Sequence, residues 1–165
     1  MKLSINEPKA VVILAKKFLN ETDIDISKDE EYLFEAVGFW KDLLTKCDAD
    51  GYTNWYMNMY NNKKRSVDHN WFALMGNINH SNDFLIGKQN KIVFKHEGKL
   101  SCYANDVKGF YWNNSGQITL TITRNELPRG RAPRYRRKII CSFIFENPSF
   151  SNFPLNPEAE PRGIL

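Results

Sequence analysis

A strict alternation of side-chain character near residue 120 constrains the fold of this chain more than any other feature. Between Gln117 and Arg124, three aliphatic residues alternate with three threonines: Ile118, Thr119, Leu120, Thr121, Ile122 and Thr123. Successive side chains of a β-strand point to opposite faces of the sheet, so the aliphatic residues share one face. β-branched residues also favour strands. The segment therefore predicts a strand with one buried and one wet face, as in an antiparallel sandwich.

Short apolar runs upstream extend this pattern. They cover residues 71–75, 84–86, 92–94 and 100–104, and Gly or Asn-Asp residues separate them. Residues 24–26 and 32–37 also resemble strands, and the charged turn between them predicts a β-hairpin whose second strand ends at Gly38. Residues 10–18 fit a helix or a buried strand equally well. These runs predict an all-β fold, an antiparallel β-sandwich.

The chain length fits a single domain. Its 165 residues are enough to bury a core. We predict one β-sandwich domain over 1–165, with a core at about 10–124, a basic loop at 124–138, an additional strand at 139–145 and an irregular tail at 147–165. The tail holds four of the seven prolines.

The positive charge of the chain is concentrated in one segment. The net charge is +4, but residues 124–138 contain seven basic residues and one acid, Glu126, so the remainder is slightly acidic. This loop is either a solvated connection or a site for a nucleic acid backbone, an acidic partner or an anionic surface. Its candidate anion-binding residues are Arg129, Arg131, Arg134, Arg136 and Arg137.

Several classes of protein lack support in the sequence. No run approaches the ~18 apolar residues that span a bilayer, and residues 10–14 are too short for a secretory signal. We expect a cytoplasmic protein, or one exported without a Sec-type signal. Of the three cysteines, Cys102 and Cys141 lie in apolar runs, which is typical of free buried thiols. No nucleophile motif, paired carboxylates or phosphate loop is present, so we expect binding and not catalysis.

The connection between residues 103 and 116 carries the most chemical information. It contains three side chains with oxygen ligands, Asp106, Asn113 and Asn114, and Gly109 is expected to let the backbone turn sharply. Oxygen-only ligands with few charges suit Ca²⁺. The alternative is a plain turn in which Asp106 accepts hydrogen bonds from backbone amides.

The same connection resembles a known calcium site. Asn105-Asp106-Val107-x-Gly109-x-Tyr111-x-Asn113-Asn114-Ser115-Gly116, followed by an alternating strand, is similar to the calcium-site segment of the galactophilic bacterial lectins of the pseudomonad type. Looser similarity extends over about residues 10–124. The resemblance implies a galactose-binding-domain-like jelly roll that binds calcium and, through the ion, a galactose-type glycan.

The resemblance also implies ligands for the ion and contacts for the sugar. Calcium would be held by Asp106, Asn113, Asn114, the carbonyl of Phe110 and a carbonyl near Asp42. The vicinal hydroxyls of the sugar would complete the calcium shell beside Val107, with hydrogen bonds to Asp106 and Asn113. Lys108 replaces the proline that is usual in the family.

The segment from 43 to 70 does not align with that family, so its sugar contacts are open. Trp55 and His69 are candidates that would stack on a sugar or bond its hydroxymethyl group, and Tyr52 and Tyr60 are further ones. Asp48-Ala49-Asp50-Gly51 resembles the start of an EF-hand loop, but its glycine comes too early, and we predict a turn. A structural subunit that forms a homo-oligomer is the remaining alternative.

Overall fold

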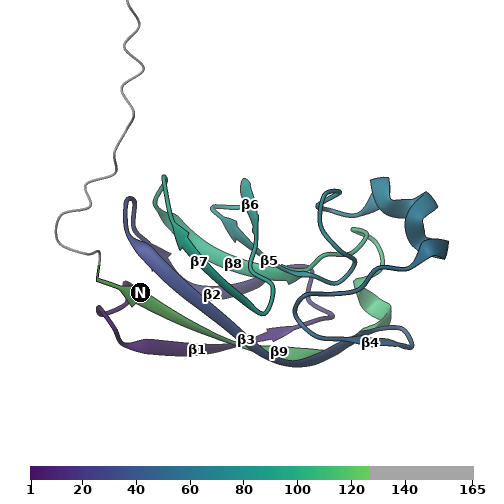
Figure 1. Cartoon of the computed structure of the whole chain (residues 1–165), viewed down its shortest axis with the longest axis horizontal. Helices are drawn as coiled ribbons and strands as arrows, with labels where there is room; N and C mark the ends of the chain where they lie inside the picture. Colours follow the sequence, from purple (N-terminus) through teal and green to yellow (C-terminus); the bar gives the residue numbers. More distant parts are fainter. Residues whose placement is uncertain (127–165) are drawn as a thin grey trace, which may run out of the picture. The chain divides into compact units, whose positions relative to one another are not determined.

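The computed structural model describes residues 1–126 of the chain, apart from the side chain of Asn58. These residues form two antiparallel sheets and two 3₁₀-helices, η1 (Trp55–Lys63) and η2 (Tyr111–Asn113) (Figure 1). The predicted all-β sandwich is confirmed. The predicted strand at 139–145, the tail at 147–165, the basic loop beyond residue 126 and its five arginines lie outside the described residues.

Each sheet is built from strands that are distant in the sequence. The first sheet has the order β1 (Pro8–Leu14), β9 (Asn114–Asn125), β3 (Glu31–Asp42) and β4 (Thr45–Cys47), and β7 (Gln89–Val93) also pairs with β3. The second has the order β2 (Asn20–Ile26), β8 (Gly98–Ala104), β5 (Leu74–Ile78) and β6 (Asn82–Leu85).

The alternating segment is a central strand of the first sheet. Ile118, Leu120 and Ile122 of β9 are fully buried, as the alternation predicts. β9 pairs with β3 over its whole length and with β1 on its other side. The apolar segment near residue 10 is therefore a strand, because β1 uses its backbone groups to extend this sheet.

The predicted hairpin between residues 24 and 37 is wrong. β2 pairs with β8 in one sheet, whereas β3 pairs with β9 in the other, so the charged turn carries the chain between the sheets. Gly38 does not end its strand either, because β3 continues to Asp42. Its φ of +117° and the 3.0 Å that would separate an added Cβ from the carbonyl oxygen of Gln117 explain the glycine.

The core lies between the two sheets and is rich in aromatic side chains. Phe84 and Phe94 pack edge to face with centroids 5.1 Å apart, and Phe34 contacts both rings. The thiols of Cys47 and Cys102 are buried and free. Neither described helix has the length and apolar character needed to cross a membrane.

Candidate functional site

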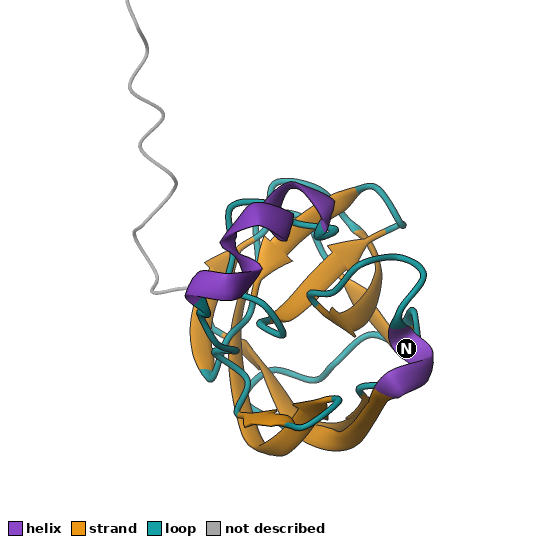
Figure 2. Ribbon diagram, turned by 90° about the vertical axis from the view of Figure 1, so that its right-hand side faces the viewer, coloured by secondary structure: helices purple, strands orange, loops and turns teal. Residues whose placement is uncertain are grey.

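The candidate site lies at one end of the sandwich, where three connections meet. Asp106 follows β8, Asn113 ends η2, and Asn114 begins β9. Asp42, the last residue of β3, is paired in register with Asn114. The two 3₁₀-helices lie at this same end (Figure 1, Figure 2). Strand pairing therefore brings the segment from 105 to 116 next to the end of β3.

The helix η1 forms the opposite wall of the site. Its first turn is capped by the side chain of Asn54, which accepts a hydrogen bond of 3.0 Å from the amide of Tyr56. Met57, Tyr60 and Lys63 are spaced three residues apart, and three residues make one turn of a 3₁₀-helix. One face of η1 thus presents a thioether, a phenol and an ammonium group to the site.

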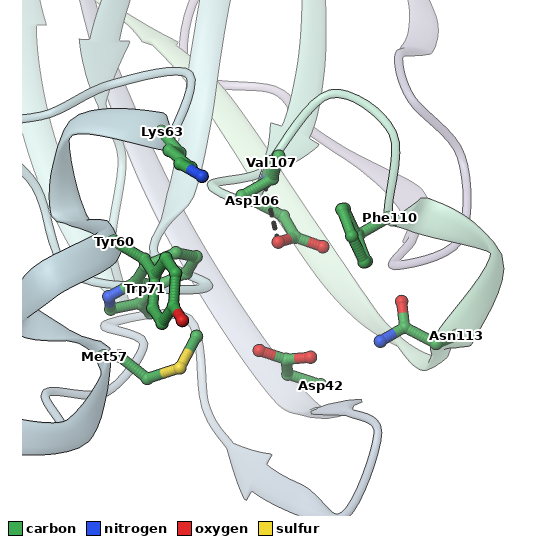
Figure 3. Close-up of a pocket in the computed structure, with 9 residues that line it drawn as sticks. All are labelled: Asp42, Met57, Tyr60, Lys63, Trp71, Asp106, Val107, Phe110 and Asn113. Atoms are coloured by element: carbon green, nitrogen blue, oxygen red, sulfur yellow. Dashed lines mark hydrogen bonds between the residues drawn. The ribbon is translucent and has the colours of Figure 1, made fainter.

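Between these walls is a pocket of about 290 Å³. Figure 3 shows its lining, with the carboxylates of Asp42 and Asp106 on one side and the side chains of η1 on the other. The lining residues are Asp42, Met57, Tyr60, Lys63, Trp71, Asp106, Val107, Phe110 and Asn113.

Asp106 is held in place by two hydrogen bonds. One carboxylate oxygen accepts a bond of 2.6 Å from the amide of Val107, and the other accepts one of 2.9 Å from the Asn114 amide nitrogen. Burial, with only 3% of the residue exposed, raises the pKa of Asp106, and these two bonds oppose that shift. The nearby charge of Asp42 raises this pKa further. A cation beside Asp106 would stabilise its charged form, offsetting both the cost of desolvation and the repulsion from Asp42.

Asp42 accepts a hydrogen bond from Tyr52, which is not itself a lining residue of the pocket. The Tyr52 hydroxyl donates to a carboxylate oxygen of Asp42. Burial and the Asp42 carboxylate raise the pKa of Tyr52, so its hydroxyl keeps the proton that it donates. This bond orients Asp42 at the pocket.

Two amide oxygens beside these carboxylates lack hydrogen-bond partners. Oδ1 of Asn113 and Oδ1 of Asn114 are both buried, and neither accepts a hydrogen bond. Leaving a buried acceptor unpaired typically costs about 1–3 kcal/mol, so such atoms are rare unless something else binds them.

The available oxygens fit a hard cation such as Ca²⁺. The carboxylate of Asp106 and the free amide oxygens of Asn113 and Asn114 are the ligand types that calcium prefers. The Phe110 carbonyl accepts one bond, 3.3 Å long, from the amide of Asn113, which leaves a second lone pair. Within residues 1–126 no group of three or more His, Cys, Asp or Glu could hold a metal. A site here therefore depends on amide and carbonyl oxygens.

The structure gathers most of the predicted site residues. Asp42, Asp106, Val107, Phe110 and Asn113 all line the pocket, and the buried Asn114 bonds Asp106 from behind. Sequence reasoning missed Met57, Lys63 and Trp71. The spacing of three in the segment after Asn54 is the signal that could have located the first two.

Two predicted sugar contacts lie outside this pocket. Trp55 is 71% exposed and packs against Tyr56, with ring centroids 3.5 Å apart. His69 lines a separate hollow with Tyr52 and Asp68. The carbonyl of His69 accepts a bond from the Lys64 ammonium, so its backbone supports the loop beside the site.

Of the two glycines in the segment from 105 to 116, Gly116 and not Gly109 is the one that the backbone requires. An added Cβ at Gly109 would have no atom within 4 Å, and its φ is not in the left-handed region, so the turn does not require glycine there. Gly116 has a φ of +86°, and an added Cβ would lie 2.9 Å from the Phe39 carbonyl oxygen. Gly116 is thus the residue that lets β9 start close against β3.

The segment from Asp48 to Gly51 forms the predicted turn. The Gly51 amide donates to the carbonyl of Asp48 over 3.1 Å. Both carboxylates of this turn lie 3.3 Å from the ammonium of Lys88. These acids are paired with a lysine, unlike the amide oxygens of the pocket.

Comparison with known proteins identifies a structural neighbour. No protein family model and no curated protein matches the chain. A solved structure, the EclA N-terminal domain, described as a PllA-like lectin, matches with a TM-score of 0.56 and 15% identity. The match covers 70% of this chain and 95% of that chain. The fold is lectin-like. This likeness concerns the fold alone. The candidate site follows from the contacts described above.

Proposed function

We propose that this chain is a calcium-dependent carbohydrate-binding protein without catalytic activity, and that its ligand is a galactose-like sugar. One observation carries the proposal. The buried oxygens Oδ1 of Asn113 and Oδ1 of Asn114 lack hydrogen-bond partners; Asn113 lines the pocket with Asp106, and Asn114 donates a hydrogen bond to Asp106. The description of the structural neighbour as a lectin supports the same function.

The residues of the site would have two roles, calcium coordination and hydrogen bonding to the sugar. Asp106, Asn113, Asn114 and the Phe110 carbonyl would hold calcium, which when bound supplies coordination positions for two vicinal sugar hydroxyls. Asp106 and Asn113 would also hydrogen-bond those hydroxyls. Such bonds fix the orientation of a diol, because two donors and two acceptors must be matched at once.

The apolar wall of the pocket suits the remainder of a sugar. Tyr60, Trp71 and Phe110 line the pocket opposite or beside the carboxylates. The C–H face of a pyranose packs well on aromatic rings, since these supply a large apolar area with few rotatable bonds. A pocket with one polar and one aromatic wall therefore matches a molecule with one polar and one apolar face.

Calorimetric titration of galactose tests the proposal. In saturating calcium we expect measurable binding that disappears when a chelator is added and returns with calcium. Asp106→Asn keeps the shape of the side chain but removes its charge, and we expect it to abolish sugar binding. Asp48→Asn, in the acidic turn paired with Lys88, is the matched control and should bind as the wild type does. Calcium-independent binding, or none from folded protein, would contradict the proposal.

A further inference from the structure

Lys63 is the one basic residue among the lining residues of the pocket. It is the last residue of η1, and Figure 3 shows its side chain extending toward Asp106 and Val107. Its ammonium lies 5.4 Å from the centroid of the Tyr60 ring, a cation–π contact. Among residues 1–126, no carboxylate forms an ion pair with Lys63. Its charge is therefore available to a ligand.

The backbone after Lys63 is held against the start of the segment from 105 to 116. Lys64 forms an antiparallel β-bridge with Val107, and the Arg65 amide donates a bond of 3.1 Å to the carbonyl of Asp106. The Lys64 side chain is buried and bonds the carbonyl of His69. These contacts hold the end of η1 beside Asp106, so Lys63 stays at the pocket even though its own side chain is exposed.

The charge balance of the pocket changes sign when calcium binds. Asp42 and Asp106 are the acidic lining residues, and Lys63 is the basic one. The empty lining carries a net charge of −1, and a divalent cation would convert it to +1. A ligand with one negative charge restores neutrality, whereas galactose leaves the excess charge uncompensated.

We propose that the preferred ligand is an acidic saccharide, a uronic acid whose diol binds calcium and whose carboxylate binds Lys63. This inference rests on the proposed function, because the diol needs the ion. A carboxylate is a strong acceptor for an ammonium group, and the bond between them is charge-assisted. Lys63 is a specificity-determining residue in this account, and the calcium ligands supply binding that neutral and acidic sugars share.

Three probes that differ little in shape test the inference: methyl galactopyranoside, methyl galactopyranosiduronic acid and the methyl ester of that acid. Each is titrated into calcium-saturated protein by calorimetry, with calcium also in the syringe. We expect the uronic acid to bind roughly 1.5-fold to fivefold more tightly than its neutral ester, the range for an exposed charge pair. The difference should shrink as salt is added.

Variants of Lys63 assign the effect to this side chain. Lys63→Met should bind acid and ester equally, and Lys63→Arg should keep the preference. Lys108→Met removes an exposed charge from the connection between β8 and β9, outside the pocket lining. This variant should also keep the preference for the acid. Equal binding of the three probes by the wild type would overturn the inference and leave the proposed function intact. Absence of binding by all three would contradict both.

Discussion

Two buried asparagines, at the two ends of the connection between β8 and β9, make opposite use of the same side chain. Asn105 is fully paired, since its Oδ1 accepts a bond from the Ser66 amide and its Nδ2 donates to the carbonyls of Ser66, His69 and Asn70. Asn114 is also buried and donates to Asp106, but its Oδ1 has no partner. The same side chain at similar depth is thus fully paired at one position and keeps an unpaired acceptor at the other.

The contrast extends to the regions around the two residues. On the Asn105 side, the loop from 64 to 72 is joined to the segment from 105 to 116 by side-chain and backbone hydrogen bonds, including one of 2.8 Å from the Phe72 amide to the Asn105 carbonyl. On the pocket side, buried oxygens are left unpaired and a carboxylate is desolvated. Stability is expected to depend on the first region, and binding on the second.

Asn105→Ala should have the largest effect on folding. The substitution removes the partner of the partly buried Ser66 amide and of the Ser66 and Asn70 carbonyls, while the His69 carbonyl keeps its bond from Lys64. We expect a loss of about 3 kcal/mol in the free energy of unfolding. Urea denaturation in chelator measures this directly. A loss below about 1 kcal/mol would remove the distinction between the two regions.

Gly116 and Gly109, both in the segment from 105 to 116, give a matched pair of substitutions with a smaller expected effect on stability. Gly116→Ala places a Cβ 2.9 Å from the Phe39 carbonyl oxygen at a positive φ, so we expect a loss of about 2 kcal/mol. Gly109→Ala meets no atom within 4 Å and should change stability by less than about 1 kcal/mol. Thermal unfolding of both variants decides the pair. Equal destabilisation would show that the turn at Gly109 also requires glycine.

The burial of Asp106 predicts a distinctive pH dependence in the calcium-free protein. Because burial raises its pKa above the ordinary value of 3.8, the folded state binds this proton more tightly than the unfolded chain does. Protonation therefore stabilises the fold below 3.8, and this contribution is lost as the pH rises through the raised pKa. Asp106→Asn should lack it. Hence wild-type stability should rise relative to the variant as the pH falls from about 7 to about 4 in urea denaturation; a constant difference would refute the raised pKa.

Asn113→Ala should have the smallest effect on the calcium-free fold. Its Oδ1 makes no hydrogen bond, so its removal should change the free energy of unfolding by less than about 1 kcal/mol. Calcium should nevertheless raise the melting temperature of the wild type and not that of this variant. A large loss of stability without calcium would mean that this side chain belongs to the scaffold.

Strand positions could be predicted from sequence, whereas strand partners could not. The alternation at Ile118 to Ile122 identifies β9, because a period of two is a local property of the chain. The partners of β2 and β3 depend on which sheet each joins, and the charged turn between them fits a hairpin and a crossing between sheets equally well. Residues 24–37 therefore led to a wrong hairpin although both strands exist, each longer than predicted.

In the candidate site, too, some residues could be predicted from the sequence and others could not. Asp106, Asn113 and Asn114 could be found because they are close in the sequence and match a known pattern. The opposite wall could not, since Lys63 and Trp71 reach the pocket through η1 and the loop tied to Asn105. Those tertiary contacts join segments about forty residues apart, and no local pattern encodes them.

Calorimetric titration of calcium into chelator-treated protein, with wild type beside Asn114→Ala and the Asp48→Asn control, tests whether calcium binds at Asp106, Asn113 and Asn114. We expect saturable binding of one calcium ion per chain by the wild type and by the control, and none by Asn114→Ala, which loses an unpaired oxygen and the bond to Asp106. Absence of binding by folded wild type, or unchanged binding by Asn114→Ala, would show that calcium is not held by these residues.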